Sequence, residues 1–313
     1  MKALWIAHLF SLNCKSSLSE FLALQSLVRD GCSVLDEKLE DSSSSWRELK
    51  KSNSSYVTKN AYLEFRGIIE AAIEKGIQFT CPGREDFPHQ LLQLSEVPFF
   101  LSYWGQPVWK GAHGLAVVGT REPSPDSEAW CEQELAAFLL SFPIFTVSGG
   151  ARGIDQICHR VSTRLGLPTV VFLPSGIEQM YPSTLGLLTE SILACGGVFV
   201  SEYLPSVSMR KQFFPRRNRL IAGLSLVCLI IEARRRSGTL ITAQQALAQH
   251  KPLLILPSHP YDGGAKGGLD LLLDGATPVR DAQDLITFIS AELLGAYGSL
   301  GDLVSIPSGH HYL

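Results

Sequence analysis

The stretch IFTVSGGARGIDQICHRVSTRL, residues 144–165, combines a strand, a loop and a helix, and the fold prediction starts from it. Residues 144–147 form a short apolar run, which predicts a buried strand. A glycine-rich loop follows, and the amphipathic pattern of residues 154–165 predicts a helix. A strand that leads into a helix through a tight turn is the repeating unit of parallel α/β sheets.

The same unit recurs along the chain from about residue 112. Strands are expected at 115–118, 144–147, 169–173, 198–201, 226–231 and 253–256. Helices are expected between them at 126–141, 154–165, 184–195, 216–224 and 239–249, with a last helix at 282–294. This alternation predicts a doubly wound α/β fold with a mostly parallel sheet. Ligands of such sheets bind at the carboxyl ends of the strands.

Residues 1–75 have a different pattern, with apolar residues near helical spacing between Leu18 and Val28 and a second helix at 62–75 that ends at Gly76. We therefore expect a small helical N-terminal domain at 1–75, a doubly wound α/β domain at 76–295 and a tail at 296–313.

The composition limits the function classes. With 45% hydrophobic and 18% charged residues, the chain is predicted to be globular, and its net charge of −3 requires any nucleic-acid binding to use a local basic patch. The seven cysteines form no CxxC pair, which favours reduced thiols in the cytoplasm and argues against zinc. No apolar run reaches the roughly 18 residues of a membrane span.

Two loops at the expected strand ends contain small residues and arginine. The first is the Gly-Thr-Arg turn that ends at Arg121, and the second contains Gly149, Gly150 and Arg152. Small residues allow a ligand to approach the backbone, and the N–H groups of a helix start attract phosphate. The alternative is that the glycines only form tight turns.

The segment from 210 to 219 concentrates basic charge. Five of these ten residues are basic and two are aromatic. Cations that hold phosphates and rings that stack on bases are typical of single-strand binding. The alternative is a solvated basic turn. The residues concerned are Lys211, Phe214, Arg216, Arg217 and Arg219.

The loop after the fifth expected strand has three arginines at 234–236, followed by Ser237, Gly238 and Thr239 at a helix start. Ser237 or Thr239 alone could be an N-cap. Together with the arginines, the group predicts a phosphate site.

Signals for catalysis are weak. Asp155 and His159 are one helical turn apart and could perform acid–base chemistry, but such residues more often tie a helix start to its neighbours. The sequence has no Ser–His–Asp order, metal-ligand cluster or Walker motif, and no GxGxxG follows the first strand. We therefore expect no metal and no dinucleotide cofactor.

Five runs of sequence carry a family resemblance: SGGARGID (148–155), SEY (201–203), FPRRNRLIAGLS (214–225), IEARRRSGTLITA (231–243) and DGATPV (274–279). Together with His159 and the lead-in at 74–107, their order and spacing resemble the DNA-processing protein A family, also called DprA or Smf. The resemblance implies an extended Rossmann-like domain that binds single-stranded DNA in a basic pocket, protects incoming DNA in natural transformation and helps to load the RecA recombinase. It also implies a homodimer without enzymatic activity.

The DNA-binding positions that the resemblance implies are Arg121, Gly149, Gly150, Arg152, Lys211, Phe214, Arg216, Arg217, Arg219, Ser237, Gly238 and Thr239. The chain departs from the family pattern at three loop positions, where Leu185 replaces the asparagine of YPxxN, Ser258 the glycine of a Pro-Gly pair and Leu269 the asparagine of G-x-N. These changes bear on the detailed shape of the pocket. The winged helix that many members carry near the C-terminus is not expected here.

Two alternative functions remain open. A related family of nucleoside-monophosphate phosphoribohydrolases uses a PGGxGTxxE loop, but Thr242 stands at its acidic position, so the base is missing. The second alternative is a recombinase-interaction protein with a degraded DNA pocket, which salt-sensitive DNA binding would exclude.

Overall fold

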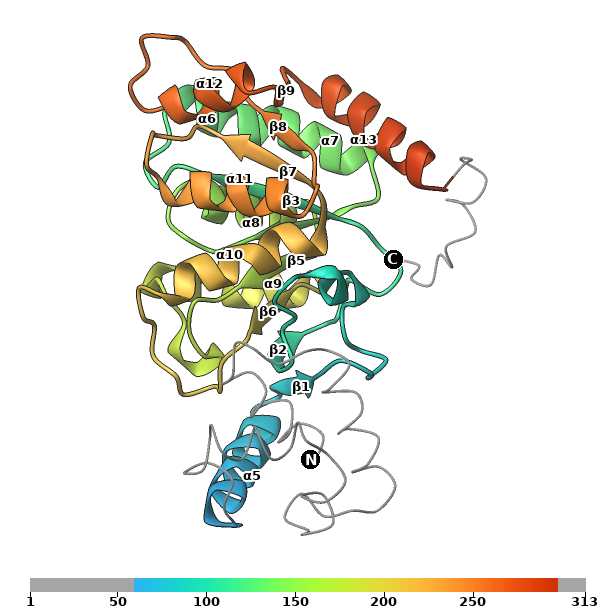
Figure 1. Cartoon of the computed structure of the whole chain (residues 1–313), viewed down its shortest axis with the longest axis vertical. Helices are drawn as coiled ribbons and strands as arrows, with labels where there is room; N and C mark the ends of the chain where they lie inside the picture. The colour runs from blue at the N-terminus through green and yellow to red at the C-terminus, as the bar shows by residue number, and fades with distance from the viewer. Residues whose placement is uncertain (1–58, 298–313) are drawn as a thin grey trace. The chain divides into compact units, whose positions relative to one another are not determined.

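The computed structural model describes residues 59–297 (Figure 1). The helices expected before residue 59 and the tail after 297 lie outside the described residues. The described chain forms two compact units. The first contains residues 59–105, 173–180 and 199–213, and the second contains residues 106–172, 181–198 and 214–297. Domain boundaries at 75 and 295 stay a prediction.

The first unit contains helix α5 (Lys59–Glu74) and the strands β1 (Gln78–Thr80), β2 (Leu101–Gly105) and most of β6 (Val198–Ser201). These strands are neighbours in the order β1-β2-β6, and β1 is antiparallel to β2. Two short 3₁₀ helices, His89–Gln93 and Ile177–Gln179, belong to the same unit. Strands β1 and β2 were not predicted, and three residues are too few for β1 to show a period-two pattern.

The end of α5 is close to the prediction. Gly76 has a φ of 82°, which a residue with a side chain rarely adopts. Its N–H donates to the Ile73 carbonyl (2.9 Å), and the next N–H, of Ile77, donates to the Ala72 carbonyl (3.0 Å). This pair of bonds satisfies the last carbonyls of the helix, so the Gly76 cap predicted from the sequence is confirmed.

The second unit has a parallel sheet. Its strands are β3 (Gly114–Gly119), β4 (Phe145–Ser148), β5 (Thr169–Phe172), β7 (Ser225–Ile231), β8 (Leu253–Ile255) and β9 (Thr277–Pro278). They are ordered β5-β4-β3-β7-β8-β9, and each strand is parallel to its neighbours in this order. The predicted doubly wound α/β fold is therefore confirmed.

The helices of the second unit lie near the predicted positions. They are α6 (Pro125–Trp130), which continues through a π-helical segment (Cys131–Leu135) into α7 (Ala136–Ser141), then α8 (Ile154–Arg164), a 3₁₀ helix (Ser183–Leu188), α9 (Thr189–Ala194), α10 (Phe213–Leu224), α11 (Gly238–Ala248), α12 (Lys266–Leu273) and α13 (Ala282–Tyr297). Helix α12 and strand β9 were not predicted. No helix within 59–297 is long and apolar enough to cross a membrane.

Alternate residues of the central strands face opposite sides of this sheet. Leu115 and Val117 of β3 are fully buried in a core that also contains Phe138 of α7, Ile157 of α8 and Ile289 of α13. Each such side chain contributes roughly 1.5–3 kcal/mol through burial. Helices α10 and α11 cross the other face, nearest the viewer in Figure 1.

The strand order reverses beside β3. The chain runs from β3 outward to β4 and β5, and later returns to β7 on the other side of β3. The loops after β3 and β7 therefore lead to helices in different directions, which opens a crevice between them. In α/β sheets of this kind, ligands bind at such a reversal point.

Candidate nucleic-acid interface

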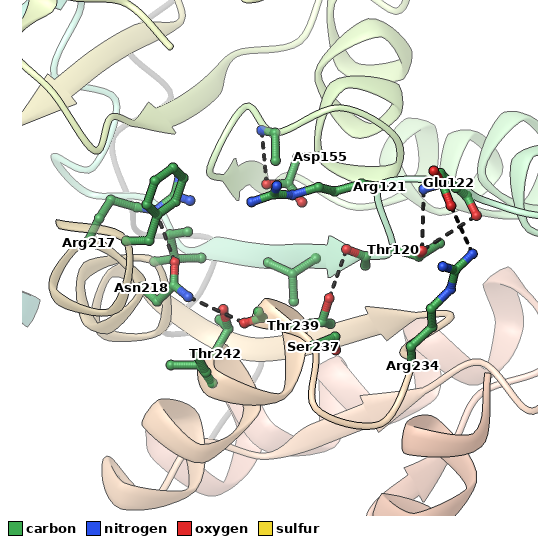
Figure 2. A pocket seen from close by; sticks show the side chains of 17 residues that line it. Thr120, Arg121, Glu122, Asp155, Arg217, Asn218, Arg234, Ser237, Thr239 and Thr242 are labelled. Atoms are coloured by element: carbon green, nitrogen blue, oxygen red, sulfur yellow. Dashed lines mark hydrogen bonds and ion pairs between the residues drawn. The ribbon is translucent and has the colours of Figure 1, made fainter. Parts of the chain in front are cut away.

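A pocket of about 390 Å³ lies in the second unit at this reversal point (Figure 2). It is lined by the end of β3 and the turn after it, by the loop before α8 and the start of that helix, by α10, by the loop after β7 and by the start of α11. Its charged lining residues are Arg121, Glu122, Asp155, Arg217 and Arg234.

The Gly-Thr-Arg turn is held from several sides. The Thr120 N–H donates to the Glu232 carbonyl (2.9 Å), and the Thr120 carbonyl accepts from the Ile154 N–H (3.1 Å). The Thr239 hydroxyl donates to the Gly119 carbonyl (2.8 Å), which joins the start of α11 to the end of β3. The fixed turn leaves the Arg121 side chain exposed while it lines the pocket.

Arg217 lines the pocket but is almost fully buried. Its side chain is buried with 5% exposure, and Nη1 donates to the carbonyls of Gly149 (2.5 Å) and Phe172 (2.7 Å). A Cβ on Gly149 would overlap the guanidinium. The glycine therefore makes room for Arg217, in addition to any role in the approach of a ligand.

The loop before α8 is hydrogen-bonded to a carboxylate of the protein itself. A carboxylate oxygen of Asp155 accepts from the Ala151 N–H (3.2 Å). Burial raises the pKa of Asp155, opposed by the nearby Arg217 and by hydrogen bonds from the loop, and burial lowers the pKa of Arg217 to about 10. Asp155 and Arg217 together supply little net charge to the pocket. The groups that attract a phosphate must therefore belong to other helices and loops.

The start of α11 is one such element. Ser237 is at the N-cap position with extended backbone angles, but its side chain makes no capping hydrogen bond, and among the described residues its shielded Oγ has no partner. Thr239 donates its hydroxyl to Gly119 and is not a cap either. The capping alternative weighed from the sequence is thus right about the position of Ser237 but not about a side-chain capping bond, and Ser237, Gly238 and Thr239 line the pocket at a helix start that no side chain caps.

An aromatic ring completes this side of the pocket. Phe214 is half-buried and lines the pocket, with the Arg121 guanidinium 5.9 Å from its ring centre. On another side it contacts Tyr181, with ring centres 6.0 Å apart and ring planes at 85°. Tyr181 begins the stretch that matches YPxxN, but it was not predicted as a site residue, and its separation from Phe214 in the sequence gives no signal of their contact.

Ion pairs occupy the rim. Arg234 pairs with Glu122 (3.0 Å), which Figure 2 shows beside the pocket, and Arg235 forms two hydrogen bonds with Asp270 of α12 (2.6 and 2.7 Å). Both pairs are exposed, so salt screens them. At least two of the three arginines predicted to hold phosphate are paired with carboxylates in the free protein.

The structure brings together only part of the predicted set. Arg121, Phe214, Arg217, Ser237, Gly238 and Thr239 line the pocket, together with the unpredicted Glu122, Asn218, Ile241 and Thr242. Gly149 and Gly150 are buried behind it, and Leu185 packs against Gly150. Arg152 is exposed, Arg216 is partly buried, and Arg219 is buried on α10, none of them lining the pocket. Lys211 belongs to the first unit, where it is exposed.

His159 does not form a catalytic pair with Asp155. It is fully buried, its Nδ1 lies 2.8 Å from the Thr169 hydroxyl, and it does not line the pocket. Burial and the nearby Arg217 lower its pKa to about 3. It ties α8 to β5, as the structural alternative expected. Within residues 59–297, no cluster of three metal-ligating side chains is found.

These features define an α/β protein with a ligand pocket at the reversal point of its sheet, formed by exposed arginine, an aromatic ring and an uncapped helix start. Residues 78–290 match the family described as DNA recombination-mediator protein A, and the chain belongs to this family. The family resemblance found in the sequence is thereby confirmed.

Several relatives are similar over the same region. Smf of Escherichia coli is 34% identical over 206 residues, 64% of this chain and 54% of that protein. Smf of Synechocystis is 32% identical over 227 residues, 71% of this chain and 56% of that protein. DprA of Streptococcus pneumoniae is 31% identical over 200 residues, 64% of this chain and 70% of that protein. The chain thus spans about half the length of the two Smf proteins.

Two solved structures are similar. DprA from S. pneumoniae has a TM-score of 0.73 at 24% identity, covering 92% of this chain and 98% of that one, and shows the shared fold. DNA processing protein A from Helicobacter pylori, reported with its single-stranded DNA binding mode, has a TM-score of 0.61 at 29% identity, covering 69% of this chain and 97% of that one.

Proposed function

We propose that the pocket of the second unit binds single-stranded DNA and turns over no substrate. The single observation that carries this proposal is the exposed Arg121 beside the half-buried ring of Phe214, in one pocket with the uncapped start of α11. The arginine and the helix start bind a phosphate, and the ring stacks on an unpaired base. The H. pylori relative, whose structure concerns single-stranded DNA, supports the same ligand.

The charge of the pocket suits a ligand that carries a phosphate. Three arginines and two carboxylates line it, in a chain whose net charge is −3. Asp155 and Arg217 offset one another below the surface, which leaves Arg121 as the exposed lining arginine outside the Arg234–Glu122 ion pair. The pocket itself should therefore attract DNA only weakly without base contacts, and its share of the salt dependence should come from few phosphate contacts.

The remaining predicted contacts belong to the same proposal. The exposed Arg152 and the partly buried Arg216 would hold phosphates beyond the pocket, and Gly149 and Gly150 would shape the loop behind it. The roles of Lys211, which is exposed on the first unit, and of Arg219, which is buried, stay predictions. In the cell, we propose that the protein works in the cytoplasm as a homodimer, protects incoming single strands during natural transformation and helps to load RecA. The names of the relatives, DNA processing protein and Smf, support a role in DNA processing.

The enzyme alternative has less support. Thr242 lines the pocket at the place where the phosphoribohydrolase loop has its carboxylate, and its side chain is buried. The Asp155 carboxylate accepts a backbone N–H and faces Arg217, so it is not a free base. Hydrolysis of a nucleotide would lack the group that activates water or ribose.

The test is a titration with a fluorescent single-stranded oligonucleotide and the matching duplex, at two salt concentrations. We expect tighter, salt-dependent binding to the single strand. Arg121→Ala should weaken binding for all sequences and lower the salt slope by about 1. Phe214→Ala should cost ~1–3 kcal/mol of binding free energy.

The matched control is Arg160→Ala, since Arg160 is exposed on α8 and does not line the pocket. Equal losses for Arg121→Ala and Arg160→Ala would remove the pocket from the proposal. A folded protein that binds neither strand nor duplex would instead favour a recombinase-interaction protein or a nucleotide enzyme, which turnover and RecA pull-down assays separate.

A further inference from the structure

We infer that Tyr181 is a second stacking platform, which holds the base next to the one on Phe214 and forces the strand to turn between the two. This inference rests on the proposed function and adds to it a contact residue and a preference among bases.

The size of the pocket requires the strand to continue outside it. Its volume, about 390 Å³, is near the lower end of ligand pockets, which range over roughly 300–1,000 Å³. A pocket of this size encloses one nucleotide, so the neighbouring nucleotide must lie on the adjoining surface. Tyr181 contacts Phe214, does not line the pocket and is 40% exposed. It therefore offers the adjoining surface an aromatic ring.

The position of Tyr181 is supported by the second unit itself. The 3₁₀ helix Ser183–Leu188 begins two residues later, and Gln156 of α8 donates to the Thr184 hydroxyl (3.0 Å) and to the Gly150 carbonyl (3.1 Å). Leu185, one of the departures from the family pattern, is fully buried and packs against Gly150. The ring is thus exposed at the end of an anchored segment, as a stacking platform must be.

The angle between the rings has a consequence for the DNA. The planes of Tyr181 and Phe214 are at 85° and their centres are 6.0 Å apart. Successive bases in a duplex lie parallel, about 3.4 Å apart along each strand. Two neighbouring bases cannot stack on both rings and on each other, so the strand must be unpaired and unstacked at this step. Weakly stacking pyrimidines meet this requirement more easily than adenines.

The test measures binding of oligothymidylate and oligoadenylate to the full chain and to Tyr181→Ala, Tyr181→Phe and Phe214→Ala. We expect the wild type to prefer oligothymidylate. Tyr181→Ala should weaken its binding about 5- to 160-fold, the range of one base–ring stack, and should reduce the preference over oligoadenylate. Tyr181→Phe should retain both. Tyr261→Ala is the matched control, because Tyr261 is 91% exposed and does not line the pocket.

A second measurement separates stacking from support of Phe214. Thymidylate strands with bromodeoxyuridine are cross-linked to the wild type by light, and the modified peptide is identified. Cross-links at Tyr181 support the inference even if Tyr181→Ala is unstable. If Phe214→Ala weakens binding while Tyr181→Ala does not, or if cross-links occur only at Phe214, the inference is overturned and the proposed function stands. If the wild type binds no single strand, the proposed function itself fails.

Discussion

Gly149 and Arg217 are in contact across the second unit, with the guanidinium over the glycine at the place where any other residue would have its Cβ. The guanidinium is at the end of a flexible side chain, but two carbonyls and the nearby Asp155 hold it. We therefore predict that Gly149→Ala lowers the free energy of unfolding by ~1–3 kcal/mol, as other overpacked cores do.

Denaturant unfolding measures this change, and Gly186→Ala is its control. A Cβ added to Gly186 would have no atom within 4 Å, and the φ of this residue is not positive, so its replacement should be nearly neutral. Equal effects of the two substitutions would contradict the contact.

Arg217→Met should destabilise the fold more than it alters DNA contacts. The substitution leaves the buried Asp155 without its cation, a change that typically costs ~3–5 kcal/mol. Adding Asp155→Asn should recover part of this loss, since the unpaired charge disappears with it. Urea unfolding of both single variants and of the double variant measures the coupling. Additive losses would show that the two side chains do not interact.

His159 should make the stability depend on pH. Its pKa in the folded protein is about 3, below the ordinary value of 6.5, because it is buried. The folded state thus binds fewer protons than the unfolded state between these values, so this contribution to stability is present above pH 6.5 and is lost as the pH falls toward 3. His159→Gln should flatten the fall in unfolding free energy over that window. Parallel curves for the two proteins would contradict the assignment.

Glu122→Gln should strengthen binding of single-stranded DNA. It removes a negative charge from the pocket lining and releases Arg234 from its ion pair, which makes one more cation available to phosphate. We expect the salt slope to steepen by about 1. Glu132→Gln removes a carboxylate of a comparable pair, with Arg164, that does not line the pocket. If both variants bind alike, the effect comes from net charge alone.

The sequence was sufficient to predict six strands, β3 to β8, and the loops at their carboxyl ends, because apolar runs and small residues carry those signals locally. The short strands β1, β2 and β9 carry no such signal. It was not sufficient to predict which side of α10 is buried. Arg216 and Arg217 are neighbours in a basic run, yet Arg216 is partly exposed and Arg217 is only 5% exposed. Which face of a helix is turned toward the sheet depends on packing against segments that are distant in the sequence. The contacts of Glu122 with Arg234 and of Tyr181 with Phe214 likewise join positions far apart in the chain.

The hydrogen bond from Thr239 to the Gly119 carbonyl joins residues 120 positions apart. One wall of the pocket is therefore synthesised long before the other, and a growing chain has no complete site until α11 has left the ribosome. A ligand that needs the complete pocket therefore cannot bind the nascent chain before that point. Such a ligand would stabilise the folded form by mass action and oppose the separation of these early and late segments.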